Sequence, residues 1–252
     1  MNQRLKGAIL LAPFVVSLFL GNIACSILTI LLGVLAYLEL QKAFANKEIK
    51  FHPILAVGFV IILSTYIITQ NLPWGLIVGV AGVSLVVWIL DSKSFINAII
   101  ELCSLLYAFI PFWFVSQIAA GDNGYQKLAF VFLISFCTDI FAMQAGKYFG
   151  KHKLTKISPK KTVEGSVGGI LATTIISALY GQLIGQSWST MAIIGGVGSI
   201  IAQLGDLFAS AIKRYCDIKD FSNLIPGHGG ILDRFDSVIF VATFIFFINL
   251  CL

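Results

Sequence analysis

The chain has 252 residues, of which 58% are hydrophobic and only 12% are charged. Soluble domains carry about 25% charged residues, so this composition excludes an ordinary soluble protein and predicts an all-α polytopic membrane protein. The formal net charge of +5 reflects basic loops between apolar segments. It is therefore no evidence for a nucleic-acid partner, and we expect none.

Nine apolar segments follow one another along the chain, and each is close to the ~20 residues that a helix needs to cross a bilayer. They predict transmembrane helices at 7–21, 23–43, 52–70, 73–91, 95–119, 124–148, 165–185, 188–214 and 234–252. Pro53 and Pro73 open the third and fourth segments, where the missing N–H of proline costs nothing.

The motifs described below all lie in the second half of the chain. We therefore expect residues 1–123 to form an N-terminal membrane region of five segments with little motif content. Residues 124–252 should form the catalytic membrane region, with cytoplasmic loops at 149–164 and 215–233.

The basic residues orient this topology. Sixteen of the seventeen Lys and Arg fall on one side of the nine segments, and only Lys127 falls on the other. The positive-inside rule makes the basic side cytoplasmic. The N-terminus should then lie in the cytoplasm and the C-terminus outside, and the basic loops would also attract anionic lipid.

Three acidic residues interrupt apolar segments, namely Glu101, Asp139 and Asp206. At 1.5 Å per residue, Asp206 lies ~10 Å deeper than Lys213, and Asp139 ~12 Å deeper than Lys147. A carboxylate at the helix centre costs about 2.5–3.5 kcal/mol on insertion scales, so such residues usually face a polar cavity and carry function. We expect function for Asp139 and Asp206, although a structural ion pair with a lysine is the alternative. Glu101 has no motif around it.

The segment at 188–214 carries a polar stripe. Its members recur at alternating steps of four and three, which places them on one helical face: Ser199, Gln203, Asp206, Ser210 and Lys213. Such a stripe could also bind helices together through Ser and Gln. The aspartate in its middle favours a site.

Two further blocks lie at the end of the segment at 124–148 and in the loop that follows it. The first runs Asp-x-x-Ala from Asp139 and then Gly-Lys-x-Phe-Gly-Lys-His-Lys. The second is the loop SPKKTVEGSVGG from Ser158, in which two lysines precede a glycine-rich helix start. Backbone N–H groups and two lysines there would suit a phosphate. A Lys-Lys-Thr loop by itself is more often a solvated turn.

The densest block runs from Ser210 to Asp236. It contains Ser-x-Ile-Lys-Arg, then Lys-Asp-x-Ser, then Pro-x-His-Gly-Gly-x-x-Asp-Arg-x-Asp. Charge this dense between two apolar runs must lie in water or form a site. Together with the two preceding blocks, it closely resembles the signature of the phosphatidate cytidylyltransferases, also called CDP-diacylglycerol synthases.

The resemblance implies a bacterial inner-membrane enzyme whose active site faces the cytoplasm. Its reaction would be cytidylyl transfer from CTP to phosphatidate, giving CDP-diacylglycerol and pyrophosphate for phospholipid biosynthesis. Its partners would be CTP, phosphatidate and the bilayer, with Mg²⁺ as cofactor. A second cation and a homodimer are further options that it raises.

Roles can be assigned to individual residues on the same basis. The candidate metal ligands are Asp206, Asp233 and Asp236. The candidate catalytic residues are these three with Lys213, Arg214, His228 and Arg234. The candidates for binding CTP or phosphatidate are Asp139, Lys160, Lys161, Thr162, Glu164, Ser210, Lys219 and Asp220.

Two other classes of function compete with this interpretation. A sister enzyme could act on another lipid, as a CTP-dependent polyprenol or dolichol kinase or an archaeal CDP-lipid synthase. The unbroken Asp206–Asp236 pattern favours cytidylyl transfer. A transporter or channel could use Asp139 and Asp206 as an ion relay, but no pair of broken helices suggests inverted repeats.

Overall fold

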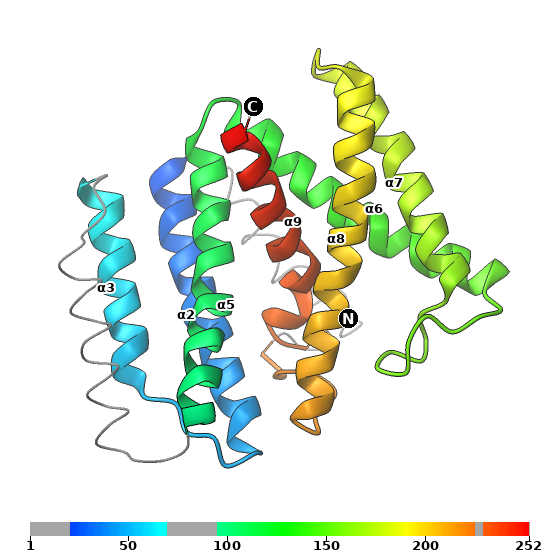
Figure 1. The fold of residues 1–252 in the computed structure, drawn as a ribbon. Coiled ribbons are helices and arrows are strands. Elements are labelled where there is room, and N and C mark those ends of the chain that lie inside the picture. Colours follow the sequence, from blue (N-terminus) through cyan, green and yellow to red (C-terminus); the bar gives the residue numbers. More distant parts are fainter. Residues whose placement is uncertain (1–20, 70–94, 225–228, 252) are drawn as a thin grey trace, which may run out of the picture. The chain divides into compact units, whose positions relative to one another are not determined.

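The computed structural model describes residues 21–69, 95–224 and 229–251. Within these ranges the regular secondary structure is helical, apart from one isolated β-bridge between Lys153 and Thr162. The helices are α2 (Asn22–Ala45), α3 (Pro53–Thr69), α5 (Phe95–Ala120), α6 (Gly124–Phe149), α7 (Val163–Leu183), α8 (Trp188–Tyr215) and α9 (Leu232–Cys251), shown in Figure 1. The all-α prediction is confirmed for this part of the chain.

Seven of the predicted segments coincide with these helices to within about two residues at each end. α3 begins at Pro53, as predicted. Among the described helices, five are long and apolar enough to cross a membrane, namely α2, α5, α6, α7 and α8. The predicted segments 7–21 and 73–91 fall mostly or wholly outside the described residues, so the nine-span topology and its orientation stay predictions.

The chain divides into two compact units. The first contains residues 1–116 together with the short segment 220–231, and the second contains 117–219 and 232–252. The charged block at 210–236 therefore belongs partly to each unit. The predicted division after residue 123 rested on motif content, and it stays a prediction.

The first unit is built on contacts of α2 with α3 and α5. Gly33 lets α5 approach α2 closely, because a Cβ atom at this position would lie 2.8 Å from the ring of Phe109. Phe109 is 1% exposed, and its ring centroid lies 5.6 Å from that of Phe59 on α3. This aromatic packing joins the three helices into one apolar core.

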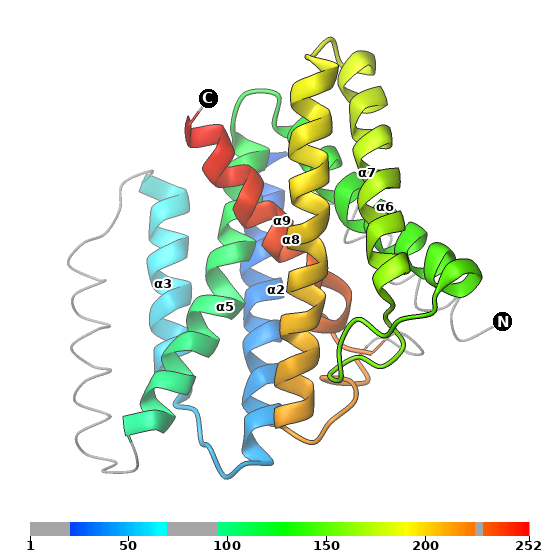
Figure 2. The same cartoon turned by 45° about the vertical axis from the view of Figure 1, so that its right-hand side comes forward.

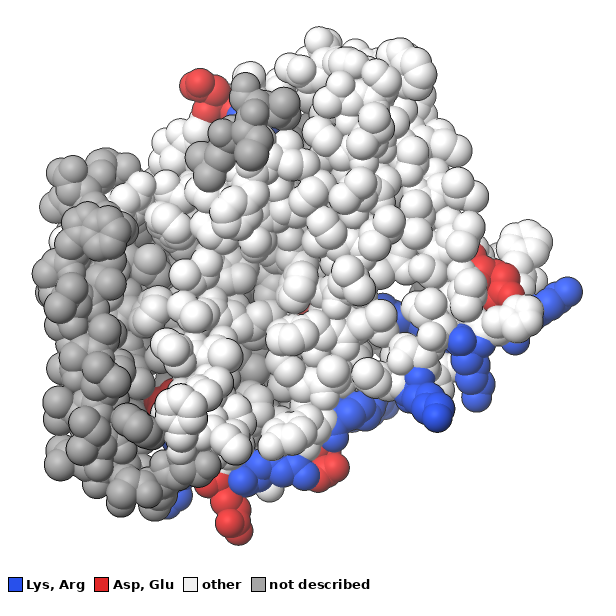
Figure 3. Space-filling model, viewed as in Figure 1, with Lys and Arg blue, Asp and Glu red and all other residues white. Residues whose placement is uncertain are grey.

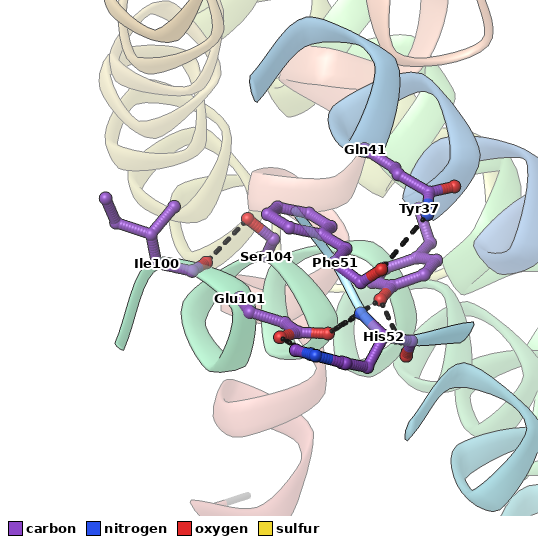
Figure 4. Close-up of polar contacts among 7 residues, drawn as sticks. All are labelled: Tyr37, Gln41, Phe51, His52, Ile100, Glu101 and Ser104. Atoms are coloured by element: carbon purple, nitrogen blue, oxygen red, sulfur yellow. Dashed lines mark hydrogen bonds and ion pairs between the residues drawn. The ribbon is translucent and has the colours of Figure 1, made fainter. Parts of the chain in front are cut away.

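A buried polar cluster lies within this unit (Figure 4). Glu101 on α5 is 4% exposed and accepts hydrogen bonds from the Tyr37 hydroxyl (3.3 Å) and from the backbone N–H of His52. Its other oxygen lies 3.0 Å from His52 Nδ1. A buried carboxylate needs such partners, so Glu101 ties α2, α5 and the start of α3 together.

The second unit consists of α6, α7, α8 and α9. α7 and α8 run side by side in both views (Figures 1 and 2). Glycines on α8 let both α7 and α9 approach it closely. A Cβ at Gly195 would overlap the Ser177 side chain of α7, and a Cβ at Gly205 would lie 2.9 Å from the Phe240 ring of α9. Small residues on α8 thus admit close neighbours at these positions.

Candidate functional site

An open cavity of about 540 Å³ lies in the second unit. Four parts of the chain meet there: the C-terminal half of α6, the 150–162 loop, the first turn of α7 and the middle of α8. The lining residues are Asp139, Ala142, Met143, Gly146, Lys147, Leu154, Ser158, Lys160, Lys161, Thr162, Gly165, Ser166, Gln203 and Asp206. The cavity therefore brings together the first two sequence blocks and the aspartate of the α8 stripe.

Lys161 is the central cation of this cavity. Its ammonium forms an ion pair with the Asp206 carboxylate, and each side chain keeps about a quarter of its surface exposed (27% and 24%). Burial lowers the pKa of Lys161 below its ordinary value, while the negative charges of Asp139 and Asp236 oppose this effect. The site thus holds a partly desolvated lysine among several carboxylates.

The α8 stripe faces the interior of the second unit. From its deep end, Ser199 Oγ accepts a hydrogen bond from Thr138 on α6 (2.8 Å), and Gln203 Oε1 accepts one from Ser166 on α7 (2.5 Å). Ser210 is 8% exposed. Ser199, Gln203 and Ser210 thus pack inside the unit, whereas Asp206 lines the cavity. The stripe therefore combines helix–helix contacts with a residue of the candidate site.

A second ion pair closes the end of the stripe. Lys213 Nζ donates to Asp233 Oδ1 at the start of α9 over 2.7 Å, and both residues are nearly buried (8% and 9% exposed). Asp236 lies one turn further along α9 and accepts from the backbone N–H of Ser237 (2.8 Å). The Ser237 hydroxyl donates to Asp139 (3.4 Å). Candidate residues from α6, α8 and α9 are therefore linked within this unit.

The start of α7 is held by its own side chains. Thr162 Oγ1 caps the helix by accepting from Gly165 N (3.1 Å). Glu164 accepts from the backbone N–H of Lys151 (3.0 Å) and lies 2.6 Å from His152 Nδ1, which braces the loop after α6. Thr162 and Glu164 thus have structural roles, whether or not they also contact substrate.

These contacts bear on how an anion could bind at this helix start. Val163 N donates to the His152 carbonyl (2.9 Å) and Ser166 N to the Thr162 carbonyl (3.0 Å). With the Gly165 cap, three of the first four N–H groups of α7 already have partners. An anion at this helix start would therefore depend mainly on the lysine side chains for its contacts.

The other predicted residues are more peripheral. Arg214 donates to the Ile218 carbonyl (3.0 Å), just past the end of α8. Lys160, Lys219, Asp220 and Arg234 are exposed, as is Arg214. His228 lies outside the described residues.

Basic side chains gather at one end of the second unit. In Figure 3, Lys and Arg lie at the lower ends of α7 and α8 on the face shown, and the surface over the helices above them is largely uncharged. The 150–162 loop contributes Lys151, Lys153, Lys156, Lys160 and Lys161 to this end. A bilayer-spanning unit with one polar face would have this pattern.

The donor set can be compared with what Mg²⁺ requires. Among the described residues, no group of three or more His, Cys, Asp or Glu side chains converges as a ligand set. Asp206 and Asp233 are each paired with a lysine, and Asp236 lies within electrostatic range of Asp139. Mg²⁺ commonly uses one or two carboxylates plus substrate oxygens. The residues therefore fit a cation held by one or two carboxylates with ligand oxygens, and not a preassembled three-carboxylate site.

One buried acidic residue was missed in the sequence. Glu39 on α2 is 4% exposed and contacts the 222–231 segment of the charged block. It is an acidic residue inside an apolar segment, the same signal that singled out Glu101, Asp139 and Asp206. That signal could have identified it.

The sequence is similar to known proteins along nearly its whole length. The model of the cytidylyltransferase family matches residues 2–252. The phosphatidate cytidylyltransferase of Staphylococcus aureus (strain COL) is 33% identical over 255 residues, covering 95% of this chain and 95% of the relative. That of Bacillus subtilis (strain 168) is 31% identical and covers 98% of this chain and 97% of the relative. With the family model spanning nearly the whole sequence, the chain belongs to the cytidylyltransferase family.

Proposed function

We propose that this protein transfers cytidylyl from CTP to phosphatidate, forming CDP-diacylglycerol and releasing pyrophosphate. The observation that carries this proposal is the cavity in which Lys160, Lys161, Asp139 and Asp206 meet. It joins sequence blocks that lie far apart along the chain, and it does so in a member of the cytidylyltransferase family. Two full-length relatives are named for this reaction.

The proposed cytidylyl transfer depends more on charge neutralisation than on proton transfer. An oxygen of the phosphatidate phosphate attacks the α-phosphorus of CTP, a new P–O–P bond forms, and the bond to the β-phosphate breaks. The attacking phosphate is already anionic near pH 7, since the second pKa of a phosphate monoester is about 6. Two anions must nevertheless meet, so positioned cations are the main requirement.

The lysines of the cavity suit this task. Lys160 is exposed at the cavity and Lys161 is half-buried beside Asp206. We assign both to the triphosphate of CTP. The basic residues at the end of α8 and the start of α9, Lys213, Arg214 and Arg234, together with Lys219, Asp220, Ser210 and His228, are the remaining candidates for the phosphates and the lipid headgroup.

The proposed ligands of Mg²⁺ come from Asp206, Asp233 and Asp236, with one or two of these carboxylates binding the ion and substrate oxygens completing its coordination. When bound with CTP, the ion would neutralise developing negative charge on the phosphates. Lys161 and Lys213 neutralise two of these carboxylates through ion pairs. Each lysine keeps its carboxylate partner from remaining an unpaired, partly buried charge.

The membrane setting follows from the same residues. We propose nine transmembrane spans with the N-terminus and the basic loops in the cytoplasm, in a bacterial plasma membrane. CTP would then reach Lys160 and Lys161 from the aqueous side. Phosphatidate would enter from the bilayer, because helices that line the cavity are apolar on their outer faces.

The direct test is product formation by the purified protein in vesicles that contain phosphatidate. Radiolabelled CTP and Mg²⁺ should yield CDP-diacylglycerol, identified by mass spectrometry, and one pyrophosphate per lipid product. Asp206→Asn should lose this activity, whereas Lys156→Ala, a change on the exposed part of the loop, should keep it. A phosphorylated lipid without cytidine would instead support the lipid-kinase alternative. Ion flux without CTP turnover would support a transporter.

A further inference from the structure

Glu39 is a buried carboxylate at the C-terminal end of α2, and its contacts reach a distant part of the sequence. Its Oε1 accepts a hydrogen bond from the Ser222 hydroxyl (2.6 Å) and another from the backbone N–H of Ile231 (2.8 Å). Both donors belong to the 220–231 segment, which packs with α2 in the first unit. One carboxylate thus holds both ends of a ten-residue stretch of the charged block.

Two glycines next to this carboxylate meet backbone requirements that other residues would not. Gly229 has φ +85°, a conformation that side chains rarely adopt. A Cβ atom at Gly230 would lie 2.7 Å from Cδ of Glu39. The second glycine of His-Gly-Gly is therefore required, at least in part, by the close approach of Glu39.

The same contact organises the start of the segment. Ser222 Oγ, while donating to Glu39, also accepts from the backbone N–H of Leu224 (3.2 Å). A hydroxyl with both roles is fixed in orientation. Hydrogen bonds to an ionised carboxylate are roughly twice as strong as neutral ones, and burial makes the loss of either partner costly.

We propose that Glu39 is a positioning residue for the reaction, which acts by holding residues 222–224 and 229–231 of the charged block in place before the substrates bind. This inference rests on the proposed cytidylyl transfer. The segment lies in the chain between Lys219 and Asp233, both assigned above to substrate or metal. Fixing its two ends reduces the conformations that this part of the block must give up on binding.

The first test measures the contact without using activity. Hydrogen–deuterium exchange of the 218–231 region in detergent should be about tenfold faster or more in Glu39→Gln than in the wild type, as expected when charge-assisted hydrogen bonds are lost. Gly230→Ala should produce the same change. Glu101→Gln is the matched control, because it removes a carboxylate equally buried in the same unit but bonded to Tyr37 and His52.

The second test measures function. At saturating CTP and phosphatidate, Glu39→Gln should lower kcat for CDP-diacylglycerol formation about tenfold or more, whereas Glu48→Gln, an exposed change just beyond α2, should not. Ser222→Ala should lower kcat less, and adding it to Glu39→Gln should cause little further loss, because the two side chains act through one contact.

Three results would overturn the inference: unchanged exchange of 218–231 in Glu39→Gln, an equal increase in Glu101→Gln, or a normal kcat despite faster exchange. A wild-type protein that forms no CDP-diacylglycerol would refute the proposed function instead. In that case the exchange experiment alone would support or overturn the positioning role of Glu39.

Discussion

The buried Lys213–Asp233 ion pair permits a quantitative prediction. The Asp233 side chain is 2% exposed, and its carboxylate lies 2.7 Å from Lys213 Nζ. Lys213→Met would preserve side-chain length but leave this carboxylate without its cation. Breaking a buried pair in this way costs about 3–5 kcal/mol. The variant could instead protonate this carboxylate, which costs about 4 kcal/mol for an ordinary aspartate at pH 7. That cost is therefore an upper limit on the loss of stability.

We therefore expect Lys213→Met to destabilise the protein by about 3–4 kcal/mol at pH 7. For a chain of this size, each kcal/mol lowers the thermal midpoint by about 2–4 °C, so the shift should be about 10 °C. The same limit falls to about 1.5 kcal/mol at pH 5, because protonation of a carboxylate is cheaper there. The deficit of the variant should accordingly shrink as the pH is lowered.

Thermal unfolding of the detergent-purified protein measures this prediction. Lys213→Met/Asp233→Leu should recover most of the lost stability, since an apolar pair can replace a buried ion pair at little cost. Lys156→Met is the exposed control and should change the free energy of unfolding by no more than about 0.5 kcal/mol. A single variant as stable as that control, or a double variant that shows the sum of two large losses, would refute the reasoning.

Three further predictions concern the basic loop. Replacing Lys160 and Lys161 together by Ala should raise KM for CTP about tenfold or more and that for phosphatidate much less, with Lys156→Ala as control; a change confined to the lipid would reassign the loop to the headgroup. Because burial lowers the pKa of Lys161, its positive charge should be lost at a lower pH than that of a solvated lysine. KM for CTP should then rise in the alkaline range, and Lys161→Arg, which keeps its charge, should flatten that rise; identical profiles would argue against a role for this ammonium. In a cysteine-free background, a cysteine at Ser158 should resist an impermeant thiol reagent in sealed cells while one at Asp122 reacts, and labelling of Ser158 in sealed cells would reverse the proposed orientation.

Much of the secondary structure of this protein could be predicted from local pattern. A helix that crosses a bilayer needs about 20 consecutive apolar residues. The ends of seven such predicted segments lie within about two residues of the ends of the seven described helices. The polar face of α8 could also be predicted from the sequence, because helical periodicity places Ser199, Gln203 and Asp206 on one side of the helix whatever packs against it.

The sequence blocks also indicated which residue types matter, but not what each one touches. Lys161 was predicted to bind phosphate, and its pairing with Asp206, forty-five residues away, follows only from the packing of α7 on α8. Thr162 and Glu164 looked like substrate contacts, yet their side chains cap α7 and brace the loop before it. A short polar residue beside a helix start can serve either purpose.

Glu39 shows the limit most clearly. It is separated by 183 residues from Ser222 and by 192 from Ile231, and nothing in its local sequence names those partners. Hydropathy and periodicity act over one helix, so they specify where a helix forms and which face is polar. The partner of a buried carboxylate depends on how distant segments pack, because its desolvation must be offset by whichever donors the folded chain brings to it.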